Sequence, residues 1–291
     1  MQGLWLQFVA GGLTAGAVYA LVALGFSIVY NASHAINFAQ GEFLMIGGMS
    51  AVSLVAAGVP RALAVPLAVV GAAIVGVLVE RIAVEPSRDA GVVTLIIGTI
   101  GVSLVLRGLA QIAWDKRIHV LPAFTAGDPI RLWGATVVPQ SLWIVGATAL
   151  AVLALGWFFE RTLFGKAMRA CAMNPLAARL VGIDTRSVMR VSFGLAGLLG
   201  ALGGVLTAPI TFTSYDVGIM LGMKGFAAAM LGGLGSFAGA VAGGLALGLV
   251  EGLGAGFVSS AYKDVIAFLV ILGVLFLMPG GMFGARRSDR V

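Results

Sequence analysis

The groups of this chain that could bind a ligand or move a proton lie in three polar stretches between apolar ones. The first is NASHAINFAQGEF, residues 31–43, where amides and a carboxylate follow the mostly apolar residues 1–30. The second is TFTSYDVGIMLGMK, residues 211–224, and the third is the basic segment 161–190. Polar groups enclosed by apolar residues need hydrogen-bond partners. Such groups could line a polar path or a gate.

Catalytic chemistry is not indicated. His34 and His119 fall in predicted loops on opposite faces, and no predicted span contains a pair of aspartates. The single cysteine, Cys171, cannot form an intrachain disulfide. The two histidines and one cysteine lie scattered along the sequence and do not indicate a metal cluster. We therefore expect no catalytic residue, no metal site, no cofactor bound by this chain and no enzymatic activity of its own.

The elements that must position these groups are membrane-spanning helices. The chain has 291 residues, of which 60% are hydrophobic and 10% charged, and its mean hydropathy is +1.06. Soluble domains usually contain about 25% charged residues. Several apolar stretches reach the roughly 20 residues that cross a hydrocarbon core of about 30 Å. The sequence predicts an all-α polytopic membrane protein with one transmembrane domain, residues 1–291, whose first apolar segment is not a removable signal peptide.

Eight or nine segments are predicted to cross the membrane. The segment 221–234 is short for a straight crossing, and 41–58 is marginal, so either could be tilted, broken or re-entrant. The glycine-rich stretches 41–52 and 223–240 could also be corresponding parts of an internal repeat. The predicted segments are 5–29, 41–58, 63–81, 93–113, 141–160, 191–213, 221–234, 237–258 and 264–282.

The distribution of basic residues predicts the orientation, because Lys and Arg accumulate in cytoplasmic loops. Eleven fall on the predicted inner side: Arg81, Arg88, Arg161, Lys166, Arg169, Arg179, Arg186, Arg190, Arg286, Arg287 and Arg290. Seven fall outside: Arg61, Arg107, Lys116, Arg117, Arg131, Lys224 and Lys263. The N-terminus is then outside with nine crossings and inside with eight, and 114–140 is the largest external loop. The net charge of +6 thus reflects topology, and we expect no nucleic-acid partner.

The basic segment 161–190 is predicted to contain a short helix. Asn174 followed by Pro175 is typical of a helix start, and Gly182 lies where such a helix would end. Leu176, Leu180 and Ile183 follow at spacings of about one turn. A helix of this kind at the membrane surface could present an apolar stripe to a partner. The alternative is an ordinary basic loop.

Charged residues inside the apolar spans indicate a specific role or partner, because inserting each into the membrane costs about 2.5–3.5 kcal/mol on insertion scales. Glu251 could line a cavity or pair with Lys224 or Lys263, and we favour the pairing. Arg107 shares a helix face with Gln111 near the external end of its span. We interpret Arg107 as a side chain that reaches towards the membrane surface.

Nearly the whole chain resembles the permease subunit of the branched-chain amino acid (leucine/isoleucine/valine) uptake systems of the ABC type. The similar stretches recur in order: GLTAGAVYALVALGFSIVY, INFAQGEFLMIG, GKAMRACAMNPLAARLVGID, GMKGFAAAMLGGLGSFAGAVAGGLALGLVE and YKDVIAFLVILGVLFLMPGGMFG. The least similar region is 114–140. The resemblance implies an ABC importer permease fold in the bacterial cell (inner) membrane, in contact with membrane lipid. Its implied partners are a second, homologous permease, two cytoplasmic ATPase subunits and an external solute-binding protein.

The resemblance also implies residue roles. No GxxxxGK[ST] pattern is present, so ATP is expected on the partner ATPases rather than on this chain. With Leu180 on the predicted helix, the family-like loop residues are assigned to ATPase coupling: Gly165, Lys166, Arg169, Asn174, Pro175, Gly182 and Ile183. Six polar residues are assigned to the translocation path: Asn37, Gln40, Glu42, Tyr215, Asp216 and Glu251.

Several alternatives remain open at this level. The solute could be urea or a short amide instead of an amino acid. An ion-coupled secondary transporter would use Glu42, Asp216 and Glu251 as coupling groups. Residues 31–43 lie on the cytoplasmic side if nine segments cross, or at membrane depth if the next helix is broken. Asn31 and Asn37 could also simply satisfy backbone ends, with Glu42 at a helix N-terminus.

Overall fold

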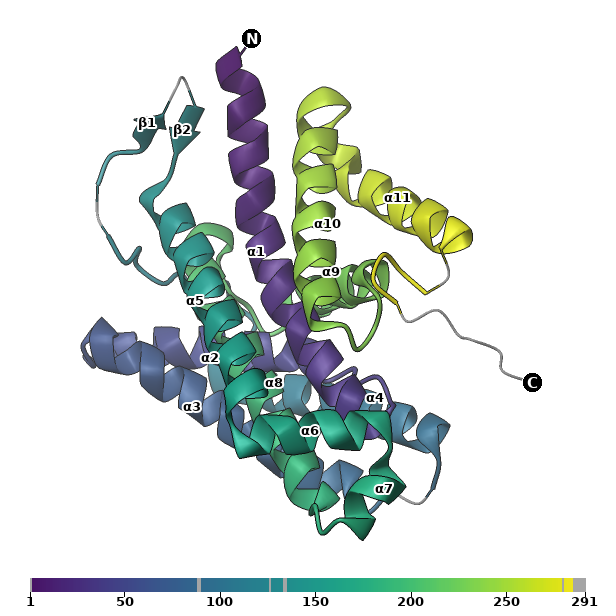
Figure 1. Cartoon of the computed structure of the whole chain (residues 1–291). Helices are drawn as coiled ribbons and strands as arrows, with labels where there is room; N and C mark the ends of the chain where they lie inside the picture. Colours follow the sequence, from purple (N-terminus) through teal and green to yellow (C-terminus); the bar gives the residue numbers. More distant parts are fainter. Residues whose placement is uncertain (1, 88–89, 126, 133–134, 279, 285–291) are drawn as a thin grey trace.

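The chain is almost wholly helical in the computed structural model, which describes residues 2–87, 90–125, 127–132, 135–278 and 280–284 (Figure 1). Among these residues, seven helical segments are long and apolar enough to cross a membrane. They contain α1 (Gln2–Ser33), α3 (Arg61–Val79), α4 (Val92–Trp114), α5 (Pro139–Arg161), α8 (Thr185–Thr211), α10 (Phe237–Phe257) and α11 (Lys263–Leu277). The all-α polytopic prediction is confirmed.

Two shorter apolar helices, α2 (Gln40–Ala56) and α9 (Val217–Gly232), complete the set that the sequence predicted. Each of the nine predicted segments coincides with one helix, and most ends agree within a few residues. The remaining elements are a π-helical turn η1 (Glu80–Val84), the helices α6 (Leu163–Met173) and α7 (Pro175–Leu180), and the turn η2 (Ser260–Tyr262). An antiparallel hairpin of β1 (Ile130–Leu132) and β2 (Ala135–Val137) lies in the predicted external loop. This hairpin was not predicted from the sequence.

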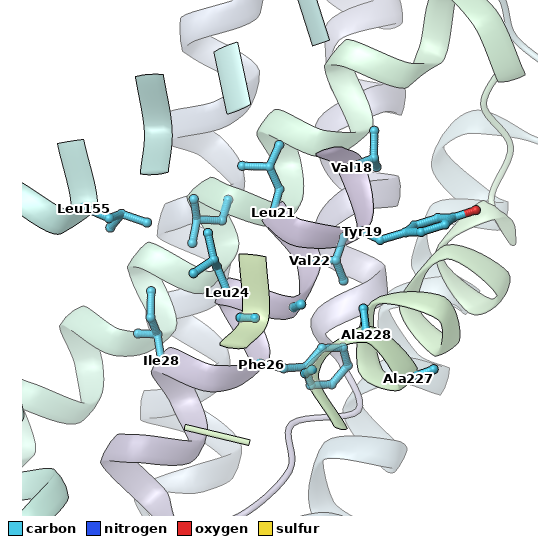
Figure 2. Packing of buried hydrophobic residues seen from close by; sticks show 14 of the residues in the cluster. Val18, Tyr19, Leu21, Val22, Leu24, Phe26, Ile28, Leu155, Ala227 and Ala228 are labelled. Carbon is cyan, nitrogen blue, oxygen red and sulfur yellow. The ribbon is translucent and has the colours of Figure 1, made fainter. Parts of the chain in front are cut away.

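Helix α1 forms the centre of the bundle. All of its residues from 16 to 29 are buried, as expected for a helix that is apolar on every side. Figure 2 shows its side chains among those of other elements: Leu155 comes from α5, and Ala227 and Ala228 come from α9. In contrast, α3, α4, α5 and α11 expose rows of large apolar side chains, such as Leu153 and Ile112, which suit contact with lipid.

The helices α1 and α10 pack with their backbones in close contact. Glycines recur every four residues on both helices, at 12 and 16 on α1 and at 244, 248 and 252 on α10. A methyl group on Gly12 would lie 2.8 Å from the carbonyl oxygen of Gly248, and one on Gly16 would lie 2.9 Å from that of Gly244. Small residues permit this approach of backbones, which holds helices together where lipid removes the hydrophobic driving force.

Helix α2 begins in the interior of the bundle rather than at one end. Gln40 packs beside Gly25 of α1, eight residues or about 12 Å before that helix ends at Ser33. The next turn of α2 packs on Gly200, near the middle of α8. Residues 34–39 therefore fold back beside α1, and α2 then runs as a continuous helix.

The two ends of the bundle are distinct. The N-terminus of α1 and the β1–β2 hairpin lie at one end, and α6 and α7 lie at the other (Figure 1). An isolated bridge of His119 with Thr213 joins the loop after α4 to the end of α8. At the opposite end, Arg190 of α8 binds Glu85 after η1 at 3.0 Å. This separation agrees with the predicted alternation; Arg88, Arg286, Arg287 and Arg290, which also entered that prediction, lie outside the described residues.

We predict that Gly248→Leu will disrupt the contact of α1 and α10. Its side chain would have to displace the backbone of α1, and overpacking of this kind costs about 1–3 kcal/mol. The apparent melting temperature of the purified protein in detergent should fall. Gly273→Leu on α11 is the matched control, because nothing lies within 4 Å of an added Cβ there. Equal melting temperatures for the two variants would contradict the packing role.

Candidate functional site

A cavity of about 520 Å³ lies beside the first turn of α2 and is bounded by α4, α9 and α11. Most of its wall is apolar, including Phe226 of α9 and Ile271 of α11. The polar side chains on its surface are Glu42, Ser103 and Arg107. The combination of a broad apolar wall and a few convergent polar groups is typical of binding sites for small molecules.

Glu42 and Arg107 form an ion pair at this cavity. The Oε1 atom of Glu42 lies 2.8 Å from Nη2 of Arg107 and accepts a hydrogen bond from the hydroxyl of Ser103, also at 2.8 Å. The guanidinium group in turn donates to the Ser103 hydroxyl at 3.1 Å. Glu42 is 1% exposed, while the side chain of Arg107 is 25% exposed. The pair joins α2 to α4 across 65 residues of sequence.

The interpretation of Arg107 as a side chain that reaches towards the membrane surface is wrong. Its guanidinium group turns into the protein because Glu42 offers a buried charge of opposite sign. Ser103, which the sequence analysis did not consider, precedes Arg107 by one helical turn and shares its partner. This i, i+4 spacing of a hydroxyl and a charge within one span was the available signal.

The two amides assigned to the path lie away from the cavity wall. The side chain of Gln40 is fully buried and donates from Nε2 to the carbonyl oxygen of Ala196 in α8, at 3.0 Å. Asn37 accepts a hydrogen bond from the backbone N–H of Ala39 at 3.1 Å, a local turn that precedes α2. Asn31 donates to the carbonyl oxygen of Gly235 at 2.8 Å. The prediction that Asn31 and Asn37 satisfy backbone groups is confirmed.

Glu251 takes part in a second charged cluster, which joins α1, α9, α10 and α11. Lys224 of α9 lies 2.8 Å from Glu251 and 2.6 Å from Asp264 of α11. The hydroxyl of Tyr19 donates to Glu251 at 2.7 Å, and its ring is visible beside α9 in Figure 2. Lys263 approaches Glu251 at 3.5 Å. The predicted pairing of Glu251 is confirmed with both lysines.

This second cluster corrects the placement of Lys224. Lys224 was predicted to lie on the external side, but it lies within α9 and is 6% exposed. Because α9 begins at Val217 rather than 221, the lysine falls in the body of the helix. Lys224 and Lys263 balance Glu251 and Asp264, so the cluster carries no net formal charge. Pairing the charges so that the cluster is neutral lowers the free-energy cost of placing such groups within a membrane.

Tyr215 and Asp216 lie in the link between α8 and α9. The hydroxyl of Ser214 donates to Asp216 at 2.6 Å, while Tyr215 packs half-buried near α2 and α8. Neither residue lines the cavity described above, although Gly218, two residues after Asp216, does. Their assignment to the path stays a prediction.

The segment 161–190 contains two helices in place of the one predicted. α7 begins as the sequence indicated, because Asn174 accepts a hydrogen bond from the backbone N–H of Ala177 at 3.0 Å and Pro175 occupies the first turn. It ends at Leu180, and Gly182 follows with φ of +87°. The N–H groups of Gly182 and Ile183 donate to the carbonyls at 179 and 178, which closes the helix in a Schellman motif.

The preceding helix α6 is packed against the membrane domain. Gly165 is buried, and a methyl group there would lie 2.6 Å from the Cα of Phe159 in α5. Thr162 caps the helix by accepting from the N–H of Gly165 at 2.9 Å. Burial raises the pKa of the Cys171 thiol on the same helix. α6 thus connects α7 firmly to α5.

Exposed side chains on these two helices form a surface without partners among the described residues. Leu176 and Leu180 on α7 are 72% and 89% exposed, whereas Ile183 packs partly buried on the core. Lys166 and Arg169 are exposed on α6. Of the predicted apolar stripe, two members are therefore available to a partner and the third anchors the segment. We call the exposed residues Lys166, Arg169, Leu176 and Leu180 the coupling surface.

Seven apolar spans joined through glycine contacts and compensated buried charges define a multi-pass membrane protein. The sequence model of the family described as "Branched-chain amino acid transport system / permease component" matches residues 8–275. The chain belongs to this permease family.

Three curated relatives show how far the similarity extends. The chain is 35% identical to the high-affinity branched-chain amino acid transport system permease protein LivH of Escherichia coli (strain K12), over 99% of this chain and 98% of that protein. It is 33% identical to BraD, the corresponding permease protein of Pseudomonas aeruginosa, over the same shares. It is 28% identical to the ribose import permease protein RbsC of E. coli (strain K12), over 88% of this chain and 80% of that one.

We predict that Lys224→Met will destabilise the protein by about 3–5 kcal/mol, because it leaves the buried carboxylate of Glu251 and the partly exposed one of Asp264 without their central cation. The control is Lys263→Met, which removes a lysine that is 44% exposed and should cost about 0–1 kcal/mol. Thermal unfolding in detergent, followed by tryptophan fluorescence, compares the two. A Lys224→Met variant as stable as Lys263→Met would contradict a structural role for the cluster.

Proposed function

We propose that this protein is the permease subunit of an ABC importer for branched-chain or similar hydrophobic amino acids in the bacterial cell membrane. The observation that carries the proposal is the cavity beside α2. Its wall is largely apolar, the ion pair of Glu42 and Arg107 lies on its surface, and the chain belongs to a permease family. A free amino acid with a branched side chain needs an apolar surface together with partners for an ammonium and a carboxylate group. The cavity offers all three.

The proposal includes partner subunits. The chain lacks a phosphate-binding loop, so ATP hydrolysis belongs to two ATPase subunits at the end that carries α6 and α7. A second, homologous permease would complete the path, and an external solute-binding protein would deliver the solute at the opposite end. The full-length similarity to LivH and BraD supports this composition.

Transmission of ATPase movement depends on the coupling surface. Leu176 and Leu180 would enter an apolar groove of an ATPase subunit, with Lys166 and Arg169 beside them. Because α6 is packed on α5 and α7 connects through Gly182 to α8, displacement of this segment would move two spans as a rigid body. Alternating access would follow from such movement of one permease against the other.

Reconstitution tests the proposal directly. The chain is incorporated into liposomes with its second permease, the ATPases and the binding protein, and uptake of L-leucine is measured. Uptake should require ATP and all of these components. Gradient-driven uptake by this chain alone would overturn the importer assignment, and ATP-dependent uptake of urea or ribose without uptake of leucine would overturn the solute assignment.

Leu180→Asp tests the coupling surface. A carboxylate within an apolar contact must be desolvated, and the loss of contact area adds to this cost, so ATP-dependent uptake should fall at least about tenfold. Co-purification of the ATPase subunits should decrease in parallel, while the amount of permease in the membrane stays constant. Ile118→Asp is the matched control, because Ile118 is also highly exposed but lies after α4, at the other end. Co-purification at the wild-type level with Leu180→Asp would contradict the docking role.

A further inference from the structure

We propose that Glu42 and Arg107 form the recognition site for the charged groups of the transported amino acid, with Glu42 binding its ammonium and Arg107 its carboxylate. The inference rests on the proposed function and assigns the solute's headgroup to two residues and its side chain to the adjoining apolar wall. It makes Arg107, which the sequence placed outside the path, a specificity-determining residue.

Unused hydrogen-bonding capacity at this pair is the first support. Only Oε1 of Glu42 has partners in the described part of the chain; Oε2 is buried and has none. The Nε atom of Arg107 is likewise buried and without a hydrogen-bond partner there. A buried polar atom left without a partner costs about 1–3 kcal/mol. Both atoms have almost no accessible surface while the internal pair is closed, so an ammonium group at Oε2 and a carboxylate at the guanidinium group would satisfy them as that pair opens.

The position of the pair is the second support. The pair is directed at a cavity of about 520 Å³, whereas Lys224, Glu251 and Asp264 are engaged with one another between α9, α10 and α11. Glycines at 41, 218 and 222 bring α2 and α9 into contact beside the cavity. Met223 and Phe226 of α9 add apolar wall on the same helix. A branched aliphatic side chain would rest on this wall while its headgroup meets the pair.

Charge balance is the third support. Glu42 and Arg107 together carry no net formal charge, and an amino acid zwitterion carries none either. When the zwitterion binds, one internal ion pair is replaced by two ion pairs to the solute, and no unpaired charge enters the membrane interior. This exchange avoids the penalty of desolvating a lone charge. A neutral solute such as urea or a sugar can form hydrogen bonds with these groups but brings no charges to replace the internal ion pair.

Paired variants test the assignment in the reconstituted importer, with ATP-dependent uptake of L-leucine as the readout. Glu42→Gln and Arg107→Gln should each reduce uptake about 10- to 100-fold, because each removes one charged hydrogen-bond partner. Arg107→Lys should also be impaired, because a lysine lacks the planar fork that matches a carboxylate.

Exchange of the two charges separates recognition from structural pairing. The double variant Glu42→Arg with Arg107→Glu can re-form an internal ion pair, so its melting temperature should recover towards wild type if the single variants are unstable. Uptake should stay low, because a reversed headgroup would direct the side chain away from the apolar wall.

Met223→Trp should also lower uptake by filling the cavity. Its matched control is Met220→Trp, because Met220 lies one turn away on α9 and is not part of the wall.

The outcomes distinguish this inference from the proposed function. If the wild-type assembly takes up leucine and Glu42→Gln or Arg107→Gln takes it up equally well, the inference is overturned while the proposed function stands. Recovery of uptake in the charge-exchanged variant also overturns it, because the pair would then act only as a structural link. If the wild-type assembly carries no leucine, the proposed function fails and the inference fails with it.

Discussion

The fold depends on backbone contact between helices that carry almost no side chain at the point of contact. In lipid, association gains little from burying apolar groups, because the solvent is as apolar as they are. Close approach at Gly12, Gly16, Gly244 and Gly248 supplies van der Waals contact instead, and it fixes α10 along α1. This arrangement places Tyr19 beside Glu251 and brings Lys224 within reach of both. The position of the central charged cluster thus follows from the glycine contacts.

The charges inside the bundle fall into two functional kinds. The cluster around Lys224 joins four helices through ion pairs and a tyrosine hydroxyl and carries no net formal charge, which suits a structural link. The pair Glu42–Arg107 is also neutral but borders a cavity and leaves polar atoms without partners in the described part of the chain. The two differ in position, because Glu42 and Arg107 line the cavity and no member of the Lys224 cluster does.

The segment between α5 and α8 is organised by local capping. Thr162 and Asn174 start its helices, and Gly182 closes the second. Hydrogen bonds from the hydroxyl of Ser187 and the N–H of Arg186 hold the pKa of Asp184 below its usual range. Asp184 therefore stays ionised at neutral pH at the N-terminus of α8, where negative charge is favourable, and this contribution is lost only as the pH falls through the lowered pKa. The caps at Asn174 and Gly182 give α7 defined ends.

The sequence by itself determined the features that depend on neighbouring residues. Apolar length predicted all nine segments, and Asn174, Pro175 and Gly182 predicted where α7 begins and ends. The resemblance to the permease family also came from the sequence, and the family match confirmed it. The sequence predicted the pairing of Glu251 with lysines, but only the tertiary structure decided that Glu42 meets Arg107. Residues 34–39 fold back to bring these two together, and hydropathy carries no information on the course of that segment. A charged residue in a span looks the same in sequence whether it faces lipid headgroups or a buried partner, and the packing of α2 against α1, α8 and α9 is what distinguishes the two.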